Sequence, residues 1–127
     1  MHPNAQLVAQ GFAAFAAGDM ATLKGIFAED AVWHVSGSNR LSGDYVGIDA
    51  ILRFFGEIAS EASFDQDLHA LLADDDGHVV ALVPTIATRG AESLSGDNIY
   101  VFHVDDGKAT EVWGTPWDQA ATDAFWG

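Results

Sequence analysis

The stretch that decides the fold is HVVALVPTIATRGAESLSGDNIYVFHV, residues 78–104. Arg89-Gly90 divides it into two segments, 78–89 and 92–104, that are rich in the β-branched and aromatic residues typical of strands. Both segments carry apolar side chains at consecutive positions, so neither face of such a sheet can lie open to water. We expect helices of this chain to cover one face and a second protein surface to cover the other.

Hairpin-type turns flank this pair of strands. Residues 74–77 read Asp-Asp-Asp-Gly and residues 105–107 read Asp-Asp-Gly, and both are turn sequences. They separate two further expected strands, at 64–73 and 108–118. From residue 64 onward the chain is therefore predicted to form an antiparallel sheet.

The N-terminal half is predicted to be mainly helical. Apolar side chains recur at helical spacing in 4–17, 20–27 and 48–59. A short strand, 31–35, and a loop of small polar residues, 36–46, lie between the second and third helices. The element order is α-α-β-α-β-β-β-β, an α+β fold class, and residues 1–127 are expected to form a single domain.

Composition excludes several classes of partner. The chain has 127 residues, no cysteine and a net charge of −14, with only five scattered basic residues. A surface of this kind repels nucleic acid and anionic membranes, so neither is an expected partner. No basic residue precedes Lys24 and no apolar run is long enough to span a bilayer. A cytoplasmic location is the expectation.

Five stretches, taken in this order of elements, carry a family resemblance: FAEDAVWHVSG (27–37), LSGDYVGIDAILRFF (41–55), HVVALV (78–83), YVFHVDDGKATEVW (100–113) and DAFWG (123–127). Together they resemble the nuclear-transport-factor-two-like superfamily, and within it the SnoaL-like, ketosteroid-isomerase-like branch. The resemblance implies a helix-lined cone over a strongly curved, mainly antiparallel sheet. It also implies cofactor-free chemistry or simple binding, because this fold carries isomerases, cyclases, dehydratases, epoxide hydrolases and inert binders.

The catalytic sets implied by the resemblance are incomplete in this chain. The base of a steroid isomerase would fall at His34 or Val35, and its carboxylic acid near 98–100, where there is no acid. The dehydratase histidine would fall at 62–64, several residues before His69. The Asp-Arg-Asp relay of the hydrolases has no match in spacing.

Polar and aromatic residues on otherwise apolar strands are the remaining candidates. Adjacent residues on a strand point to opposite faces, so only one of Trp33 and His34 is expected to face a cavity. His34 and His103 are the candidate bases, because an imidazole titrates near neutral pH, and Tyr45 is the third candidate catalytic residue. Each histidine also has a structural interpretation, with His103 at a dimer interface. The candidate ligand-binding residues are Trp33, His69, Asn98, Tyr100, Trp113 and Trp117.

The sequence thus predicts a protein that binds a small, largely apolar molecule and performs cofactor-free acid–base chemistry on it. Isomerisation, cyclisation, dehydration and hydrolysis all fit. The alternative is a non-catalytic ligand-binding or dimerisation domain. A cavity that holds an imidazole would favour the enzyme, whereas a cavity of aromatic and aliphatic groups would favour the binder. No metal site is expected, because the histidines lack ligand spacing, and a homodimer through the outer sheet face is expected.

Overall fold

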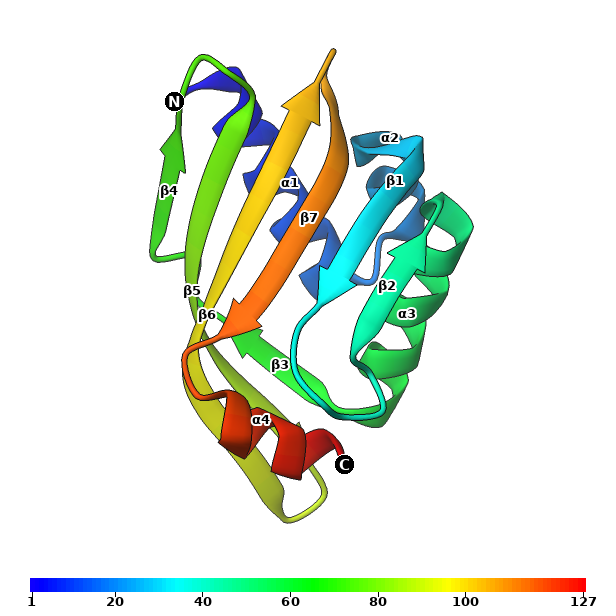
Figure 1. Ribbon diagram of the computed structural model, residues 1–127, viewed down its shortest axis with the longest axis vertical. Helices are drawn as coiled ribbons and strands as arrows, with labels where there is room; N and C mark the ends of the chain where they lie inside the picture. The colour runs from blue at the N-terminus through cyan, green and yellow to red at the C-terminus, as the bar shows by residue number, and fades with distance from the viewer.

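The computed structural model describes residues 1–127 and shows one curved sheet with helices packed behind it (Figure 1). The sheet contains seven strands in the order β2-β1-β7-β6-β5-β3, and β4 pairs with β5 beside β3. All neighbouring strands are antiparallel except β1 and β7, which run parallel. The strands are β1 (Phe27–Val35), β2 (Gly43–Val46), β3 (Ser63–Gln66), β4 (Ala70–Ala73), β5 (His78–Arg89), β6 (Glu92–Asp105) and β7 (Lys108–Pro116).

Three helices line the concave face of this sheet, and the fourth, at the C-terminus of the chain, packs against β6 and β7 (Figure 1). The helices begin at side-chain caps in three cases: His2, Asp19 and Asp118 each accept a hydrogen bond from a backbone N–H of the first turn. None of them is long and apolar enough to cross a membrane. The helices are α1 (Pro3–Ala17), α2 (Met20–Ile26), α3 (Ile48–Glu61) and α4 (Gln119–Trp126).

The main core lies between the helices and the concave face. α3 is strongly amphipathic and buries Ile48, Ile51, Phe54 and Phe55 on its inner side. Alternate residues of β5 belong to the same core on the sheet side, beside α1, and the side chains of 79, 81 and 83 are fully buried. The same alternation sends the residues between them to the outer face, away from the helices.

The expected fold class is confirmed: the chain is α+β, with helices over a curved, mostly antiparallel sheet. The strands expected at 78–89 and 92–104 are β5 and β6. Three details differ from the prediction. The loop expected at 36–46 contains β2, β1 begins at Phe27 rather than Ala31, and the C-terminal segment forms the helix α4.

The strand expected at 64–73 is two strands, β3 and β4, on the same edge of β5. Gln66 pairs with Thr85 and Ala70 pairs with Leu82, so three residues face only two residues of β5. One of those two is Pro84, which has no N–H to donate to a regular ladder. The extra residue and the missing N–H of Pro84 interrupt the pairing with β5, so residues 64–73 form two strands instead of one.

Candidate functional site

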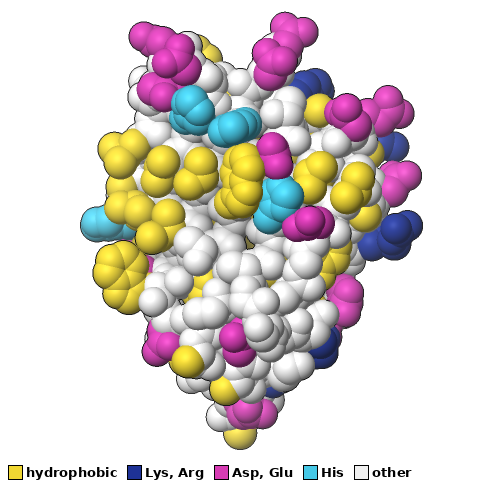
Figure 2. All heavy atoms as spheres, viewed as in Figure 1, with side chains coloured by type: hydrophobic (Ala, Val, Ile, Leu, Met, Phe, Trp, Pro, Cys, Tyr) yellow, Lys and Arg dark blue, Asp and Glu magenta, His cyan; other side chains and the backbone are white.

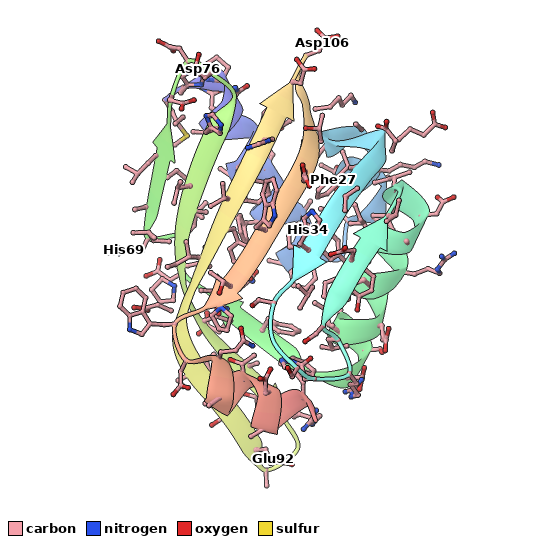
Figure 3. All side chains as sticks on the ribbon, in the orientation of Figure 1. Phe27, His34, His69, Asp76, Glu92 and Asp106 are labelled. Atoms are coloured by element: carbon pink, nitrogen blue, oxygen red, sulfur yellow. The ribbon has the colours of Figure 1, made fainter.

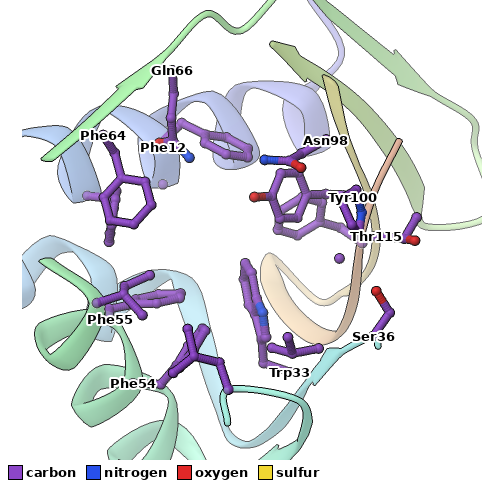
Figure 4. Close-up of a pocket in the computed structure, with 18 of the residues that line it drawn as sticks. Phe12, Trp33, Ser36, Phe54, Phe55, Phe64, Gln66, Asn98, Tyr100 and Thr115 are labelled. Carbon is purple, nitrogen blue, oxygen red and sulfur yellow. The ribbon is translucent and has the colours of Figure 1, made fainter. Parts of the chain in front are cut away.

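A cavity of about 170 Å³ lies inside the cone, between the helices and the concave face of the sheet. Hydrophobic residues make up 18 of the 28 that line it, so the cavity wall is mainly apolar. Figure 4 shows aromatic rings from α1, α3, β1 and β6 facing one another around the hollow. The arrangement is that of an apolar pocket with a few polar groups.

The aromatic rings hold one another in edge-to-face and tilted contacts. The Trp33 ring lies 5.0 Å from Phe55 and 5.9 Å from Tyr100, measured between ring centroids. Phe12 of α1 lies 5.4 Å from Tyr100 at a steep angle. Contacts at these distances favour fixed ring orientations, so the wall presents a defined shape to a ligand.

The polar groups of the cavity are uncharged. Burial raises the pKa of Tyr100 to about 12, so its hydroxyl remains a hydrogen-bond donor at neutral pH. The neighbouring Asn98 side chain opposes that shift through a hydrogen bond. Gln66 of β3 brings a second amide to the wall (Figure 4). None of the residues lining the cavity is Asp, Glu, His, Lys or Arg.

The Trp33 indole offers a further donor. Its side chain is only 8% exposed, yet no protein atom accepts a hydrogen bond from it. Every polar side-chain atom that is sealed inside the protein has a partner. The indole N–H is therefore accessible from the cavity, where a ligand oxygen can accept from it.

α4 borders the cavity through Gln119, Thr122 and Trp126. Hydrogen bonds join the helix to the segment after β1. Asn39 Nδ2 donates to Asp123 Oδ1 at 2.8 Å, and Ser36 Oγ donates to Gln119 Oε1 at 2.6 Å. The Asn39 bond holds the pKa of Asp123 below its usual range, with the Ser38 N–H and Gln119 adding to the effect.

Among the sequence-predicted site residues, Trp33, Asn98 and Tyr100 line the cavity. His34 does not, because it follows Trp33 on β1 and points to the outer face (Figure 3). Both of its ring nitrogens lie 2.6 Å from carboxylate oxygens, Nε2 from Glu111 and Nδ1 from Asp44. These hydrogen bonds raise the pKa of His34 and leave neither nitrogen free to take a proton from a substrate.

His103 and Trp113 lie beside His34 on the outer face. The His34 ring stacks on the Trp113 ring at 5.2 Å, and the His103 ring meets Trp113 edge-on at 4.9 Å. The structure thus brings together three residues that the sequence singled out, but on the side of the sheet opposite the cavity.

The other predicted residues are dispersed. Tyr45 does not line the cavity: its hydroxyl donates to the Leu41 carbonyl at 2.7 Å, and its ring stacks on Phe54, which does. Burial raises the pKa of Tyr45. His69 is exposed in the segment between β3 and β4 (Figure 3), and Trp117 is 75% exposed beside α4.

Gln66, Ser36 and Asn39 are cavity residues that the sequence did not single out. Gln66 shares the face of β3 with Phe64, and that alternation is the signal that could have indicated it. Ser36 and Asn39 lie in the irregular segment after β1, where no periodic pattern of apolar residues could predict which side chains face the cavity. The structure has no group of His, Asp and Glu arranged to hold a metal ion.

Comparison with known proteins agrees with this architecture. The sequence model of the SnoaL-like domain matches residues 8–112. Uncharacterized proteins of Mycobacterium tuberculosis and Mycobacterium bovis are 34% identical over 122 residues, covering 94% of this chain and 93% of theirs.

Solved structures are similar over nearly the whole chain. Bal32a, from a soil-derived mobile gene cassette, is 36% identical with a TM-score of 0.94, over 98% of this chain and 97% of that one. An NTF2-like protein of Burkholderia xenovorans LB400 shares the fold at 22% identity, with a TM-score of 0.85 over 100% and 98% of the two chains. The sequence match over most of the chain and the cone seen in the structure lead to one conclusion: this chain belongs to the SnoaL-like domain family.

Proposed function

We propose that the protein binds a small, largely apolar, uncharged molecule inside the cone. The observation that carries this proposal is the composition of the cavity wall. It combines aromatic and aliphatic side chains with neutral hydrogen-bond donors, and it contains no charged side chain. An anionic ligand would have no cation to meet there and would approach a protein of net charge −14.

The size of the cavity narrows the ligand class. An engineered protein cavity of about 150 Å³ lined by apolar side chains binds benzene. A cavity of about 170 Å³ therefore suits a molecule of one or two rings. The donors on Tyr100, Asn98 and Trp33 favour a ligand that carries an acceptor oxygen, such as a cyclic ketone.

Cofactor-free chemistry on that ligand is the second candidate. The Tyr100 hydroxyl beside Asn98 supports it, because a protonated phenol can stabilise an oxyanion that develops on a ketone. The same wall offers no imidazole or carboxylate as a base, since His34 and His103 lie on the outer face. Binding is therefore the function that the geometry supports best.

Titration with 1-tetralone, a two-ring ketone, and with tetralin, the matched hydrocarbon, tests the binding proposal. Binding is expected to change indole emission and to raise the melting temperature, because a ligand at 100 times its Kd adds about 2.7 kcal/mol to stability. The emission change should be smaller in Trp33→Phe, where Trp126 is the remaining indole of the cavity wall, and should be unchanged in Trp113→Phe, whose indole lies on the outer face. No response from any one- or two-ring compound at millimolar concentration would refute the proposal.

Exchange of the ketone α-protons in D2O, followed by NMR, tests the catalytic candidate. If Tyr100 stabilises the enolate that forms when deuteroxide from the solvent removes an α-proton, the protein should accelerate exchange, and Tyr100→Phe should reduce that acceleration by roughly 10²-fold. If the ketone binds but its α-protons exchange no faster than in buffer, the protein binds without catalysis and the catalytic candidate is refuted.

A further inference from the structure

A second, smaller hollow of about 70 Å³ lies beside the cavity, at the start of α4. Residues of β5 and β6 line one side of it, and Trp117 and Asp118, in the loop that leads from β7 to α4, line the other. Figure 1 shows the β5–β6 hairpin continuing beyond the end of β7, beside α4. We call this hollow the recess.

One layer of side chains separates the recess from the cavity. The rings of Phe64 and Trp126, which belong to this layer, stack at 6.1 Å between centroids. Asn98 also belongs to it and lies beside Tyr100, whose hydroxyl is a donor for a ligand ketone (Figure 4). A substituent that begins beside the ketone oxygen can therefore reach the recess past Asn98. The residues that line both hollows are Phe64, Asn98, Pro116, Thr122 and Trp126.

Gly96 leaves open space in the recess. It lies on β6 directly opposite Thr85 of β5, and the pairing of the two strands is regular on both sides of it. Its φ is not in the left-handed region, and a Cβ added there would meet no atom within 4 Å. Glycine inside a strand lowers stability and is used at bulges, at bends or where a ligand comes close to the backbone. Since neither the φ nor the neighbours of Gly96 require a glycine, the space above it is free for a ligand.

The polar groups of the recess are mainly hydrogen-bond acceptors. The Thr85 hydroxyl, on a side chain that is only 7% exposed, donates to the Val83 carbonyl at 2.9 Å. The Thr122 hydroxyl donates to the Asp118 carbonyl at 2.8 Å. Both hydroxyl protons are used within the chain, so these oxygens can only accept from a ligand, and the carboxylates of Asp97 and Asp118 also only accept. The recess therefore suits a ligand group that donates a hydrogen bond.

The charge around the recess disfavours an anionic group. None of the residues that line it is Lys or Arg, whereas two are Asp. In the view of Figure 2 the Lys and Arg side chains gather on the side of β1, β2 and α3, opposite the loop that joins β7 to α4. A carboxylate tail would meet repulsion and no cation there. A hydroxyl is the uncharged donor that suits both the recess and the uncharged cavity beside it.

We propose that the recess is a second compartment of the ligand site, in which the ring of the ligand occupies the cavity while a short hydroxyl-bearing tail passes Asn98 and ends above Gly96, donating to the Thr85 hydroxyl oxygen. This inference rests on the proposed function and narrows its ligand class to cyclic ketones that carry a hydroxyalkyl group next to the carbonyl.

The size of the recess limits the tail to a few atoms. A cavity of about 150 Å³ holds benzene, so a hollow of about 70 Å³ suits a substituent rather than another ring. Trp117, which the sequence indicates as a ligand-binding residue, lines the recess instead of the cavity. Its side chain is 75% exposed, which leaves an indole surface against which the carbons of the tail can pack.

Calorimetric titration with 1-tetralones substituted at carbon 2 tests the proposal. The hydroxymethyl, 2-hydroxyethyl and 3-hydroxypropyl compounds are each compared with the alkyl compound of the same length, which are ethyl, propyl and butyl. At the length that reaches Thr85, the hydroxyl compound should bind roughly 5- to 10-fold more tightly than its alkyl partner. A wholly apolar site would give the opposite order, because burial of an unpaired hydroxyl is unfavourable.

Two outcomes separate this inference from the proposed function. If 1-tetralone binds but no hydroxyl compound binds more tightly than its alkyl partner, the recess is not a ligand compartment, and the proposed function stands. If neither 1-tetralone nor any substituted compound binds, the proposed function is refuted, and this inference is refuted with it.

Variants locate the hydroxyl of the tail. Gly96→Val fills the recess without a clash at Cβ, and valine favours strands, so the variant should melt no lower than the wild type. The ratio of the alkyl Kd to the hydroxyl Kd should fall to about one in Gly96→Val, and also in Thr85→Val, which removes the acceptor and keeps the side-chain shape. Ser93→Val is the matched control, because it adds valine to the same strand outside both hollows and should keep the ratio. A hydroxyl preference that persists in Gly96→Val or in Thr85→Val would overturn the proposal.

Discussion

At the scale of the residue, the two faces of the sheet are two different chemical environments. Trp33 and His34 are neighbours on β1, yet the indole of Trp33 faces an uncharged cavity and the imidazole of His34 meets two carboxylates on the outer face. The pleat of a strand imposes this separation. Chemistry that needs a charged base and chemistry that needs an apolar wall are therefore kept on opposite sides of the sheet.

The two tyrosines should behave differently when they lose their hydroxyls. Tyr100→Phe removes a donor from the cavity and should weaken ketone binding by roughly 3- to 10-fold, with tetralin unaffected. Tyr45→Phe removes the bond to the Leu41 carbonyl and should cost about 1 kcal/mol of stability without changing ketone affinity. Calorimetric titration and urea unfolding of both variants measure the two effects. Equal effects of the two changes on ketone affinity would contradict this assignment of Tyr100.

The sequence singles out candidate residues at this scale, but it does not predict which side of the sheet each one occupies. The alternation at 33–34 predicts opposite faces and leaves open which residue faces in. The answer depends on β2 and β7, which bring Asp44 and Glu111 to His34 from distant parts of the chain. Asn98 and Tyr100, which the sequence singles out as polar residues on an apolar strand, line the cavity.

At the scale of the element, α4 and the segment after β1 depend on each other. Gly37 has a φ of +92°, and a Cβ at this position would overlap the Gln119 amide and the Asp123 carboxylate. The close approach lets Ser38 N–H and Asn39 donate to Asp123. A glycine is required both by the backbone conformation and by the packing of α4.

Gly37→Ala should therefore cost more than backbone strain alone. We expect a loss of roughly 1–3 kcal/mol in the free energy of unfolding and weaker ketone binding, because α4 must move away from the cavity. Gly90→Ala is the matched control: its φ is also positive, at +62°, but nothing lies within 4 Å of the added Cβ. Urea unfolding of the two variants gives the comparison. If Gly90→Ala proves as costly as Gly37→Ala, the contact with α4 is not the cause.

The elements that sequence predicts well are those whose signal is local. β5 and β6 are rich in strand-forming residues and end at clear turns, α3 has strong helical periodicity, and all three form nearly as expected. β2 is only four residues long and exists because Val32, Trp33, His34 and Val35 pair with it. Likewise α4 is short and is held by distant residues, Arg40 and Arg89, that bond its last carbonyls. Tertiary contacts rather than propensity define such elements.

At the scale of the whole molecule, a net charge of −14 opposes association of two copies. Added salt should therefore tighten the homodimer that the sequence predicts, because the Debye length falls from about 10 Å at 0.1 M to about 3 Å at 1 M. Sedimentation velocity in increasing NaCl measures its Kd. A dimer held mainly by ion pairs between the copies would instead weaken with salt, and that result would contradict an apolar contact.

The parallel pairing of β1 with β7 has a consequence for how the cone assembles. Val32 pairs with Glu111 and Trp33 with Val112, although most of the chain separates these residues. The hairpins β5–β6 and β6–β7 close short loops, so they can form early in folding, whereas the pairing of β1 with β7 requires β7 to be in place. We therefore expect the part of the cone that carries Trp33 to fold last. Substitutions in the β5–β6 turn should slow folding, and substitutions at the β1–β7 seam should mainly speed unfolding.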